Sequence, residues 1–314
     1  MNALPETFVR TIKGVHGDVG AKWLDELPAL LRECERRYEL RLLPPFELSF
    51  NYVAPAVRAD GLPCVLKLGV PADPERAREP AALRLFAGRG AVRVLDADDE
   101  RGILLLERLL PGRTLHHVAP DEEAVRIAAG LLRRLRTLAP VGEAAAAFPT
   151  TADWARGLER LRARFGDGTG PLPERLVARA EAEFARLHAA PDGPLLLLHG
   201  DLHHGNILSG QREPWLAVDP KGVVGESAFG VVQFLLNNLP ENDDEAAVRL
   251  IRRRIAQFAE ELGLRASRIA AWTFAHMVLS AWWCIEDDTD GADGTIRLAA
   301  LLENDLTTEE ETQR

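Results

Sequence analysis

The spacing of apolar and polar positions predicts a chain that begins with a helix, continues with short strands and then becomes mostly helical. Apolar side chains recur on one face over residues 18–38, as in an amphipathic helix, and two prolines end that segment. Short apolar runs bounded by turn residues then predict strands. These strands fall at residues 47–57, 63–69, 92–95 and 102–109, with a helix at 75–87 among them.

Beyond Pro111 and Gly112 the pattern changes. Helical spacing dominates, at residues 121–138, 153–165 and 174–190 and from Phe229 to the end, and two short strands are predicted at 195–198 and 215–218. A chain of 314 residues is also too long for one ordinary core. We therefore expect an α+β fold with a small β-rich domain, residues 1–110, and a larger, mostly helical domain, residues 111–314.

Composition narrows the class of protein. Apolar residues make up 46% of the chain, which is enough for a substantial core, and the net charge is −10. A nucleic-acid-binding protein normally has a basic face, so the charge disfavours nucleic acid as a partner and allows a cationic ligand. The scattered Cys34, Cys64 and Cys284 predict no disulfide framework. No signal peptide or membrane-length apolar run is visible, so we expect a cytoplasmic protein without a membrane partner, of undetermined oligomeric state.

The strongest chemical signal is the polar loop that follows the predicted strand 195–198. It contains Asp201 and, five positions later, Asn206, and a second carboxylate, Asp219, follows another predicted strand. One carboxylate can position a hydroxyl and accept its proton, while an amide and a second carboxylate supply the hard oxygen ligands that Mg²⁺ prefers. This set of groups predicts phosphoryl transfer.

A lysine in an apolar strand supports that prediction. Lys67 is one of only four lysines in the chain and lies in the run Val-Leu-Lys-Leu. As a phosphate ligand it would be held by a carboxylate from the next helix; we favour Glu79, with Glu75 as the competing partner. The order lysine, glutamate, aspartate, asparagine, aspartate is the order of these groups in kinases, and the Asp–Asn spacing is that of the kinase catalytic loop.

Taken together, these motifs resemble the aminoglycoside phosphotransferases. The resemblance is closest to the branch of streptomycin 6-phosphotransferases and hydroxyurea kinases, and it spans residues 23–283. It rests on four segments: Val65–Leu68, Leu104–Gly112, His199–Asn206 and Val218–Glu226. It implies a protein-kinase-like bilobal fold, with a small β-rich N-lobe and a larger helical C-lobe, and transfer of the γ-phosphate of ATP to a hydroxyl.

The resemblance also implies roles for single residues. Asp201 would be the catalytic base, and Asn206 and Asp219 would hold Mg²⁺. The nucleotide-binding residues would be Lys67 with Glu79, at the phosphates, and the segment from Glu107 to Leu109. The chain departs from the family pattern at Ser49–Tyr52, where the loop expected to cover the phosphates contains no glycine.

Several residues have a second interpretation. His199, His203 and His204 could join Asp201 in a transition-metal site of a hydrolase, although no second spaced histidine motif supports it. The aromatic residues of 271–288 have the spacing of a core helix. Glu286, Asp287 and Asp288 at its end oppose the helix dipole, so they are either solvated or contact a cationic acceptor. Glu226 is likewise an acceptor candidate or an ion-pair partner of Lys221.

The sequence thus predicts an ATP- and Mg²⁺-dependent kinase of a small hydroxylated molecule, and the best candidate is a streptomycin-like aminoglycoside. Hydroxyurea or another small metabolite is the alternative acceptor. A catalytically silent nucleotide-binding module is the alternative from another class, and only the glycine-free loop favours it.

Overall fold

The computed structural model describes residues 4–71 and 77–312, with side chains up to Glu303. The chain divides into two compact units. Unit 1 comprises residues 1–113 and 208–221, and unit 2 comprises residues 114–207 and 222–314. The predicted boundary near Pro111 had assigned residues 208–221 to the second domain. Instead this short strand–loop–strand segment, which includes Asp219, groups with the first unit.

Unit 1 is built on a five-stranded antiparallel sheet in the order β1-β2-β3-β5-β4. Its strands are β1 (Leu40–Leu42), β2 (Tyr52–Arg58), β3 (Pro63–Leu68), β4 (Val94–Asp98) and β5 (Ile103–Glu107). Central β3 pairs with β2 on one side and β5 on the other, so Lys67 lies opposite Val53 and Leu104. Of these strands, the sequence pattern did not predict β1, which is only three residues long.

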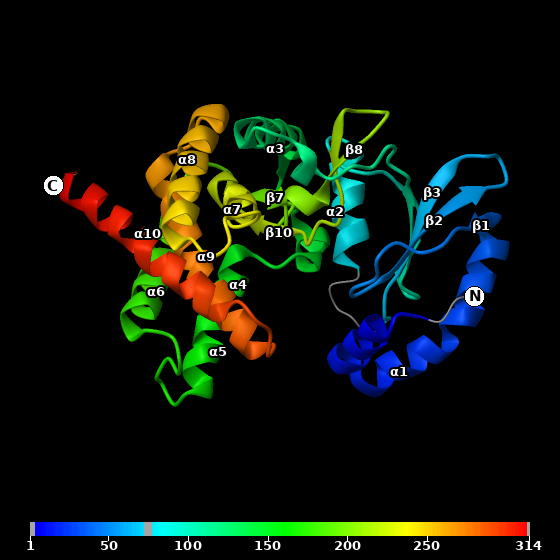
Figure 1. Cartoon of the computed structure of the whole chain (residues 1–314), viewed down its shortest axis with the longest axis horizontal. Coiled ribbons are helices and arrows are strands. Elements are labelled where there is room, and N and C mark those ends of the chain that lie inside the picture. Colours follow the sequence, from blue (N-terminus) through cyan, green and yellow to red (C-terminus); the bar gives the residue numbers. More distant parts are fainter. Residues whose placement is uncertain (1–3, 72–76, 313–314) are drawn as a thin grey trace. The chain divides into compact units, whose positions relative to one another are not determined.

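Helix α1 (Glu6–Arg37) packs on this sheet, as Figure 1 shows in blue. Its first part was not predicted, and Gly17, with φ of 54°, breaks the helical geometry there because glycine adopts positive φ without strain. Apolar side chains along α1, including Phe8, Trp23 and Leu27, are buried together with Leu66 and Leu68 of β3. The helix α2 (Arg78–Phe86) also belongs to unit 1, and the predicted positions 75 and 76 lie outside the described residues.

Unit 2 is mostly helical. Its α-helices are α3 (Asp121–Leu135), α4 (Thr151–Ala155), α5 (Gly157–Arg164), α6 (Glu174–Ala189), α7 (Val232–Leu235), α8 (Asp244–Leu262), α9 (Ala266–Glu286) and α10 (Ala292–Thr312). A three-stranded sheet in the order β10-β7-β6 comprises β6 (Thr137–Leu138), β7 (Leu196–Leu198) and β10 (Val223–Gly225). The two-stranded ribbon of β8 (Ile207–Ser209) and β9 (Trp215–Ala217) follows the polar loop after β7, and from residue 208 on it groups with unit 1.

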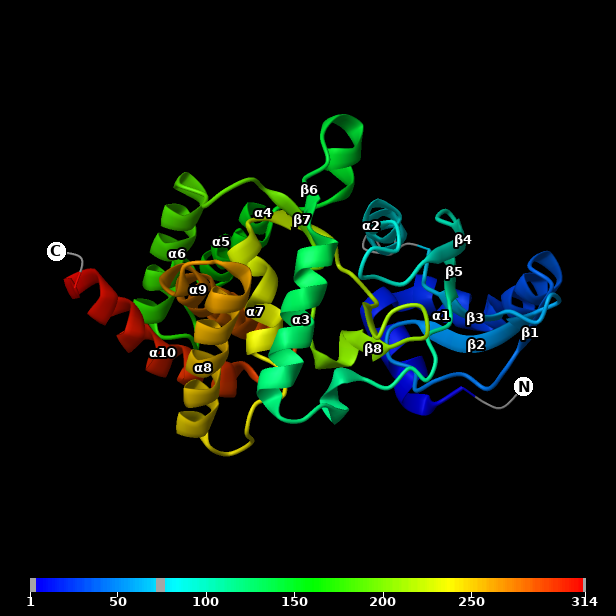
Figure 2. The same cartoon turned by 90° about the horizontal axis from the view of Figure 1, so that it is seen from above.

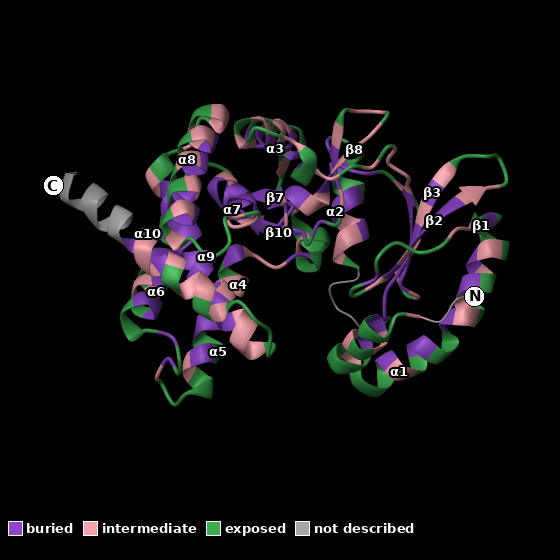
Figure 3. Ribbon diagram, in the orientation of Figure 1, coloured by how far each residue is buried: buried purple, intermediate pink, exposed green. Residues whose placement is uncertain are grey.

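Capping residues define both ends of α8 in unit 2. Asp243 caps α8 by accepting a hydrogen bond from the Ala246 N–H, and Gly263 ends the helix in the left-handed conformation. Helices α3 and α8 lie side by side (Figure 2). Most residues of helix α9 are buried, as its purple segments in Figure 3 indicate. The reason is that the helix itself carries apolar side chains on nearly every side. No helix in the described part of the chain is long and apolar enough to cross a membrane.

Candidate active site

Two carboxylates of unit 1 meet at Lys67. Its Nζ lies 2.6 Å from Oε2 of Glu79, on α2, and 2.7 Å from Oδ1 of Asp219, which follows β9. The side chains of Lys67 and Glu79 are 11% and 12% exposed, whereas that of Asp219 is 51% exposed. The Lys67–Glu79 ion pair that the sequence predicts is therefore present. The competing partner, Glu75, lies outside the described residues.

Burial and charge act differently on the members of this cluster. Burial alone would lower the pKa of Lys67, but the two carboxylates raise it above its ordinary value, so Lys67 stays charged. Burial raises the pKa of the Glu79 carboxyl to about 7, and Lys67 offsets only part of this rise. The other oxygen of Glu79, Oε1, is buried with no hydrogen-bond partner among the described residues. The cluster is thus a fixed cation beside a half-exposed carboxylate.

The backbone holds Asp219 in an uncommon conformation. Its φ is 59°, in the left-handed region that side chains other than those of glycine, asparagine and aspartate rarely adopt. Such strained residues persist only where the surrounding structure fixes them. Here the ion pair with Lys67 fixes the side chain, so the strained backbone and the buried lysine together orient one carboxylate.

The polar loop of unit 2, residues 199–206, holds Asp201 and Asn206 together. The Asn206 amide Nδ2 donates to the Asp201 carbonyl at 2.9 Å and lies 3.4 Å from its Oδ2. The Asn206 N–H donates to the carbonyl of His203 at 3.0 Å, which closes the turn. Because Nδ2 faces Asp201, the amide Oδ1 is the atom of Asn206 left to act as a hard oxygen ligand.

His199 braces the start of this loop. Its ring is 1% exposed, and its Nδ1 accepts a hydrogen bond from the Asp201 N–H at 3.3 Å. Its carbonyl accepts from the N–H of Gly222 at 3.1 Å, which ties the loop to the segment entering β10. Gly200 between them has φ of 81°, a conformation that glycine adopts readily. His199 therefore supports the backbone of Asp201.

His204, near the end of the same loop, is also held by packing, which the sequence did not predict. The His204 ring is buried and stacks on Phe234, with ring centroids 4.0 Å apart. The fully buried Arg254 donates to the carbonyls of Phe234 and Asn237 and pairs with Asp121 at 2.6 Å. The sequence did contain a signal for Arg254. It shares the buried face of α8 with residues at positions 251, 255 and 258, which are spaced for one side of a helix.

The histidines do not form a transition-metal site. His199 and His204 are committed to the loop backbone and to an aromatic stack, and the Nδ1 of His203 accepts from the Gly205 N–H at 3.0 Å. In the described ranges, no three His, Cys, Asp or Glu side chains gather as metal ligands. A magnesium ion that shares its ligands with phosphates needs no such cluster, since one or two oxygen side chains suffice.

The segment Glu107–Leu109 lies at the end of β5. The Glu107 carboxylate accepts from Arg212 at 2.6 Å and from the Arg93 N–H at 3.0 Å, and the Glu107 N–H donates to the Arg93 carbonyl. Its side chain therefore serves the packing of unit 1. The nucleotide-binding role of the segment Glu107–Leu109 stays a prediction.

The glycine-free loop forms the connection from β1 to β2. Residues 43 and 46 still pair with the backbone of β2, so the turn itself is confined to residues 47–51. Phe50 at its tip is 60% exposed. The loop thus connects the first two strands of the sheet, and its part in covering phosphates stays a prediction.

The prediction for Glu226 is wrong. We expected an acceptor contact or an ion pair with Lys221, but its side chain is 2% exposed and pairs with Arg268 at 2.5 and 2.6 Å. It also accepts hydrogen bonds from Trp272 Nε1 and from the Asp192 N–H. The two side-chain donors to this carboxylate, Arg268 and Trp272, are buried on α9, so Glu226 stabilises the packing of that helix.

The structure also changes the interpretation of the acidic residues at the end of α9. Arg160 of α5 pairs with both oxygens of Glu286, at 2.8 and 2.7 Å. This guanidinium supplies a positive charge at Glu286, where the sequence had left open a solvated end or a cationic acceptor. Asp287 and Asp288 remain exposed at the helix end, and Asp288 has φ of 52°.

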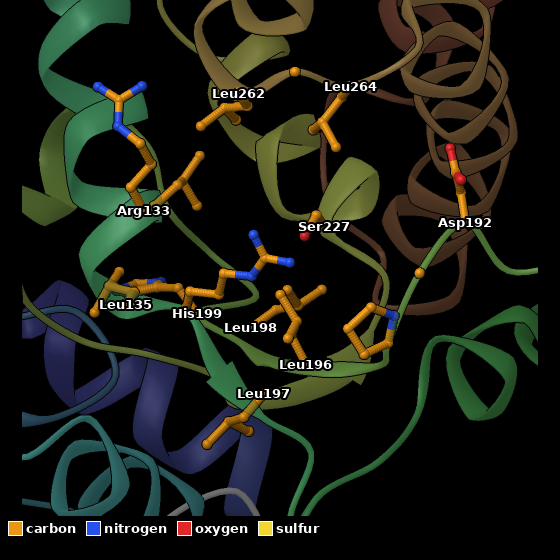
Figure 4. Close-up of a pocket in the computed structure, with 15 residues that line it drawn as sticks. Arg133, Leu135, Asp192, Leu196, Leu197, Leu198, His199, Ser227, Leu262 and Leu264 are labelled. Atoms are coloured by element: carbon orange, nitrogen blue, oxygen red, sulfur yellow. The ribbon is translucent and has the colours of Figure 1, made fainter.

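A cavity of about 250 Å³ in unit 2 adjoins the loop (Figure 4). Leucines of β7 and of the turn after α8 line it, together with Arg133, Asp192, His199 and Ser227. Neither Asp201 nor Asn206 lines it. We therefore do not assign the acceptor to this cavity.

A family model and individual relatives place the chain in the same group of proteins. Residues 46–288 match the family described as aminoglycoside/hydroxyurea antibiotic resistance kinase. A streptomycin 6-kinase of Streptomyces glaucescens is 35% identical over 311 residues, which cover 95% of this chain and 96% of that protein. A hydroxyurea phosphotransferase of Kitasatospora aureofaciens is 36% identical, covering 90% of this chain and 81% of that protein.

Among solved structures, the choline kinase LicA from Streptococcus pneumoniae has a TM-score of 0.64 at 14% identity, covering 90% of this chain and 99% of that one. At that identity the likeness concerns the fold alone, and it confirms the kinase-like fold predicted from the sequence. The family match covers most of the chain, and the two relatives span nearly all of it. This protein therefore belongs to the aminoglycoside/hydroxyurea antibiotic resistance kinase family.

Proposed function

We propose that this protein transfers the γ-phosphate of ATP to a hydroxyl of a small molecule, and that the acceptor is a streptomycin-like aminoglycoside. The observation that carries the proposal is the cluster in which buried Lys67 is held between Glu79 and the half-exposed Asp219. A charged lysine in an apolar strand is unfavourable unless carboxylates pair with it, and Glu79 and Asp219 do so here. Polyphosphate is the partner that fits a fixed cation beside a carboxylate.

The donor set fits nucleotide and magnesium. Lys67 would bind the phosphates as a point charge, and Glu79 would hold it in place. Asp219 and the amide oxygen of Asn206 would bind Mg²⁺, and the backbone toward Leu109 would receive the base. When bound, Mg²⁺ neutralises the charge that develops on the phosphates.

Asp201 acts on the acceptor. As the general base it would orient the acceptor hydroxyl and accept its proton, and the hydrogen bond from Asn206 limits how far the Asp201 backbone can move. The loop is further held by His199 and His204, neither of which needs to change protonation. Proton acceptance by one positioned carboxylate is the protein's main contribution to the chemical step in this proposal.

Hydroxyurea is the second acceptor to consider, because one of the two relatives is a hydroxyurea phosphotransferase. The test is a panel of hydroxylated acceptors, including streptomycin and hydroxyurea, supplied with ATP with and without Mg²⁺. ADP release is measured against an acceptor-free control, and each product is identified by mass spectrometry. The proposal predicts Mg²⁺-dependent ADP release with formation of phosphorylated streptomycin. ADP release no greater than the control with every acceptor would contradict it and would favour a silent nucleotide-binding module.

A further inference from the structure

Helix α9 carries an aromatic stripe, and the structure divides its members into two kinds. Trp272, Phe274 and Trp282 are 1%, 0% and 1% exposed, so they belong to the core, as their helical spacing predicts. Trp283 is only partly buried, and so is Trp154 on α4, whose ring lies 5.6 Å away in an edge-to-face arrangement. These two indoles form the outer edge of a cluster whose inner members include Phe229 and His276.

The base of this cluster is polar and uncharged. The His276 ring lies 5.6 Å from that of Trp283, is 1% exposed, and its Nε2 forms a hydrogen bond with the Gln233 amide at 3.1 Å. Burial lowers the pKa of His276 to about 4, so the imidazole is neutral at physiological pH. Its Nδ1 is buried and has no hydrogen-bond partner among the described residues. A buried nitrogen without a partner is unfavourable, so a ligand that reached it could supply the missing hydrogen bond.

The charge around the cluster is mixed, because Asp153 pairs with Arg156 and Glu286 pairs with Arg160, and the negative surplus comes from the end of α9. Glu286 lies one helical turn beyond Trp283, where Arg160 pairs with it, and the exposed Asp287 and Asp288 follow. A neutral aromatic surface bordered by carboxylates attracts a cation and not an anion, because the faces of indole rings carry partial negative charge.

The cluster is also connected to the catalytic loop. Helix α7 carries Gln233, which bonds to His276, and the next residue, Phe234, stacks on His204 of the loop. All of these residues belong to unit 2. A ligand held at Trp154 and Trp283 would therefore be positioned by the same compact unit that carries Asp201.

We propose that Trp154 and Trp283, with the Gln233–His276 pair at their base, bind a guanidinium or ammonium group of the acceptor. This inference rests on the proposed function, and it selects between the two acceptors that the relatives leave open. Streptomycin is cationic and hydroxyurea is neutral and small, so the cluster favours streptomycin. The residues that determine specificity are then the two partly exposed tryptophans, and the acidic helix end contributes attraction at longer range.

Binding is measured by calorimetric titration of streptomycin and of hydroxyurea without ATP, so that the result does not depend on turnover. The variants are Trp154→Leu and Trp283→Leu, which keep an apolar side chain and remove the ring, and Trp283→Tyr, which keeps an aromatic face. Phe165→Leu is the matched control, since Phe165 is a 37% exposed aromatic residue of the same unit that contacts Trp282 instead. ATP affinity of each variant is the control for folding.

We expect either leucine substitution to raise the Kd for streptomycin about 3- to 30-fold, the range for loss of a cation–aromatic contact. Trp283→Tyr should retain most of the affinity, and Phe165→Leu should bind as the wild type. Unchanged affinity in both leucine variants overturns the inference, and so does a failure of the wild type to bind streptomycin.

The wild type alone gives an independent check if a leucine variant does not fold. It should bind streptomycin at least about tenfold more tightly than hydroxyurea, and the reverse order overturns the inference. The two proposals fail separately. Streptomycin binding that depends on the tryptophans, without ADP release, contradicts the proposed function alone. ADP release with wild-type binding in both leucine variants contradicts the tryptophan site alone.

Discussion

The Nζ of Lys67 lies 2.7 Å from Oδ1 of Asp219, although 152 positions separate the two residues in the chain. The contact joins the middle of β3 to the segment after β9, which is why residues 208–221 group with unit 1. It links the lysine that we propose binds phosphate to the carboxylate that we propose binds Mg²⁺.

Replacing Asp219 tests whether this carboxylate contributes to Mg²⁺-dependent ATP binding. In Asp219→Asn the charge of the proposed metal ligand is removed while its shape and its tolerance of positive φ are kept. We expect ATP affinity measured with Mg²⁺ to fall, and affinity measured without Mg²⁺ to change little. The measurement is calorimetric titration of ATP in both conditions. Equal Mg²⁺ dependence in the variant and the wild type would show that Asp219 is not a metal ligand.

Glu79 gives a prediction for pH. Its pKa is raised from 4.5 to about 7 in the folded protein, so folding favours its protonated form. The stability from this group is fully present below pH 4.5 and is lost as pH rises through about 7. The loss should amount to about 3 kcal/mol, because a tenfold change in proton affinity corresponds to about 1.4 kcal/mol.

The comparison is urea unfolding of the wild type and Glu79→Gln at pH 5 and pH 8. The wild type should lose more stability than the variant between these two values, because glutamine does not titrate. If both proteins lose the same stability, Glu79 does not titrate in this range and stays ionised beside Lys67.

The two ion pairs of α9 should differ sharply in their contribution to stability. Glu226→Gln leaves Arg268 charged and buried without its partner, which typically costs about 3–5 kcal/mol. Glu286→Gln breaks an exposed pair with Arg160, which is worth about 0–1 kcal/mol. Denaturant unfolding checks both values. A small loss for Glu226→Gln, together with a raised KM for the acceptor, would return Glu226 to the acceptor site.

Asp287 and Asp288 should act at a distance. Exposed charges are screened over about 8–10 Å at physiological salt, so attraction between these carboxylates and a cationic acceptor weakens as salt rises. The double variant Asp287→Asn/Asp288→Asn should raise the KM for streptomycin at low salt and match the wild type at high salt. An increase in KM that persists at high salt would indicate direct contact.

The sequence predicted much of this structure because local signals were strong. The turn residues around 63–68 and the spacing in α3 and α6 defined elements that the structure contains almost unchanged. The isolated Lys67 predicted the ion pair with Glu79 that the structure contains, whereas the roles of Asp201 and Asn206 stay predictions. These signals depend on neighbouring residues, which sequence alone displays.

Other features depend on contacts between distant segments. The partner of Glu226 is Arg268, 42 positions away, and no local pattern distinguishes it from other arginines. Arg160 and Glu286, 126 positions apart, likewise meet only through the packing of α5 against α9. Trp272 and Trp282 are buried, whereas Trp283 is partly exposed. Helical spacing does not predict this difference, because α9 is apolar on nearly every side and so has no single buried face.

The central claim is that Asp201 accepts the acceptor's proton in an ATP-dependent phosphoryl transfer. The most direct measurement compares the wild type with Asp201→Asn in Mg²⁺-dependent ADP release with streptomycin, alongside ATP binding by calorimetry. Asp293→Asn, an exposed substitution on α10, is the matched control. We predict a loss of turnover of about 10²- to 10⁴-fold with ATP affinity nearly unchanged, because loss of a general base slows the chemical step and not nucleotide binding. Turnover by Asp201→Asn within a few-fold of the wild type would contradict the claim.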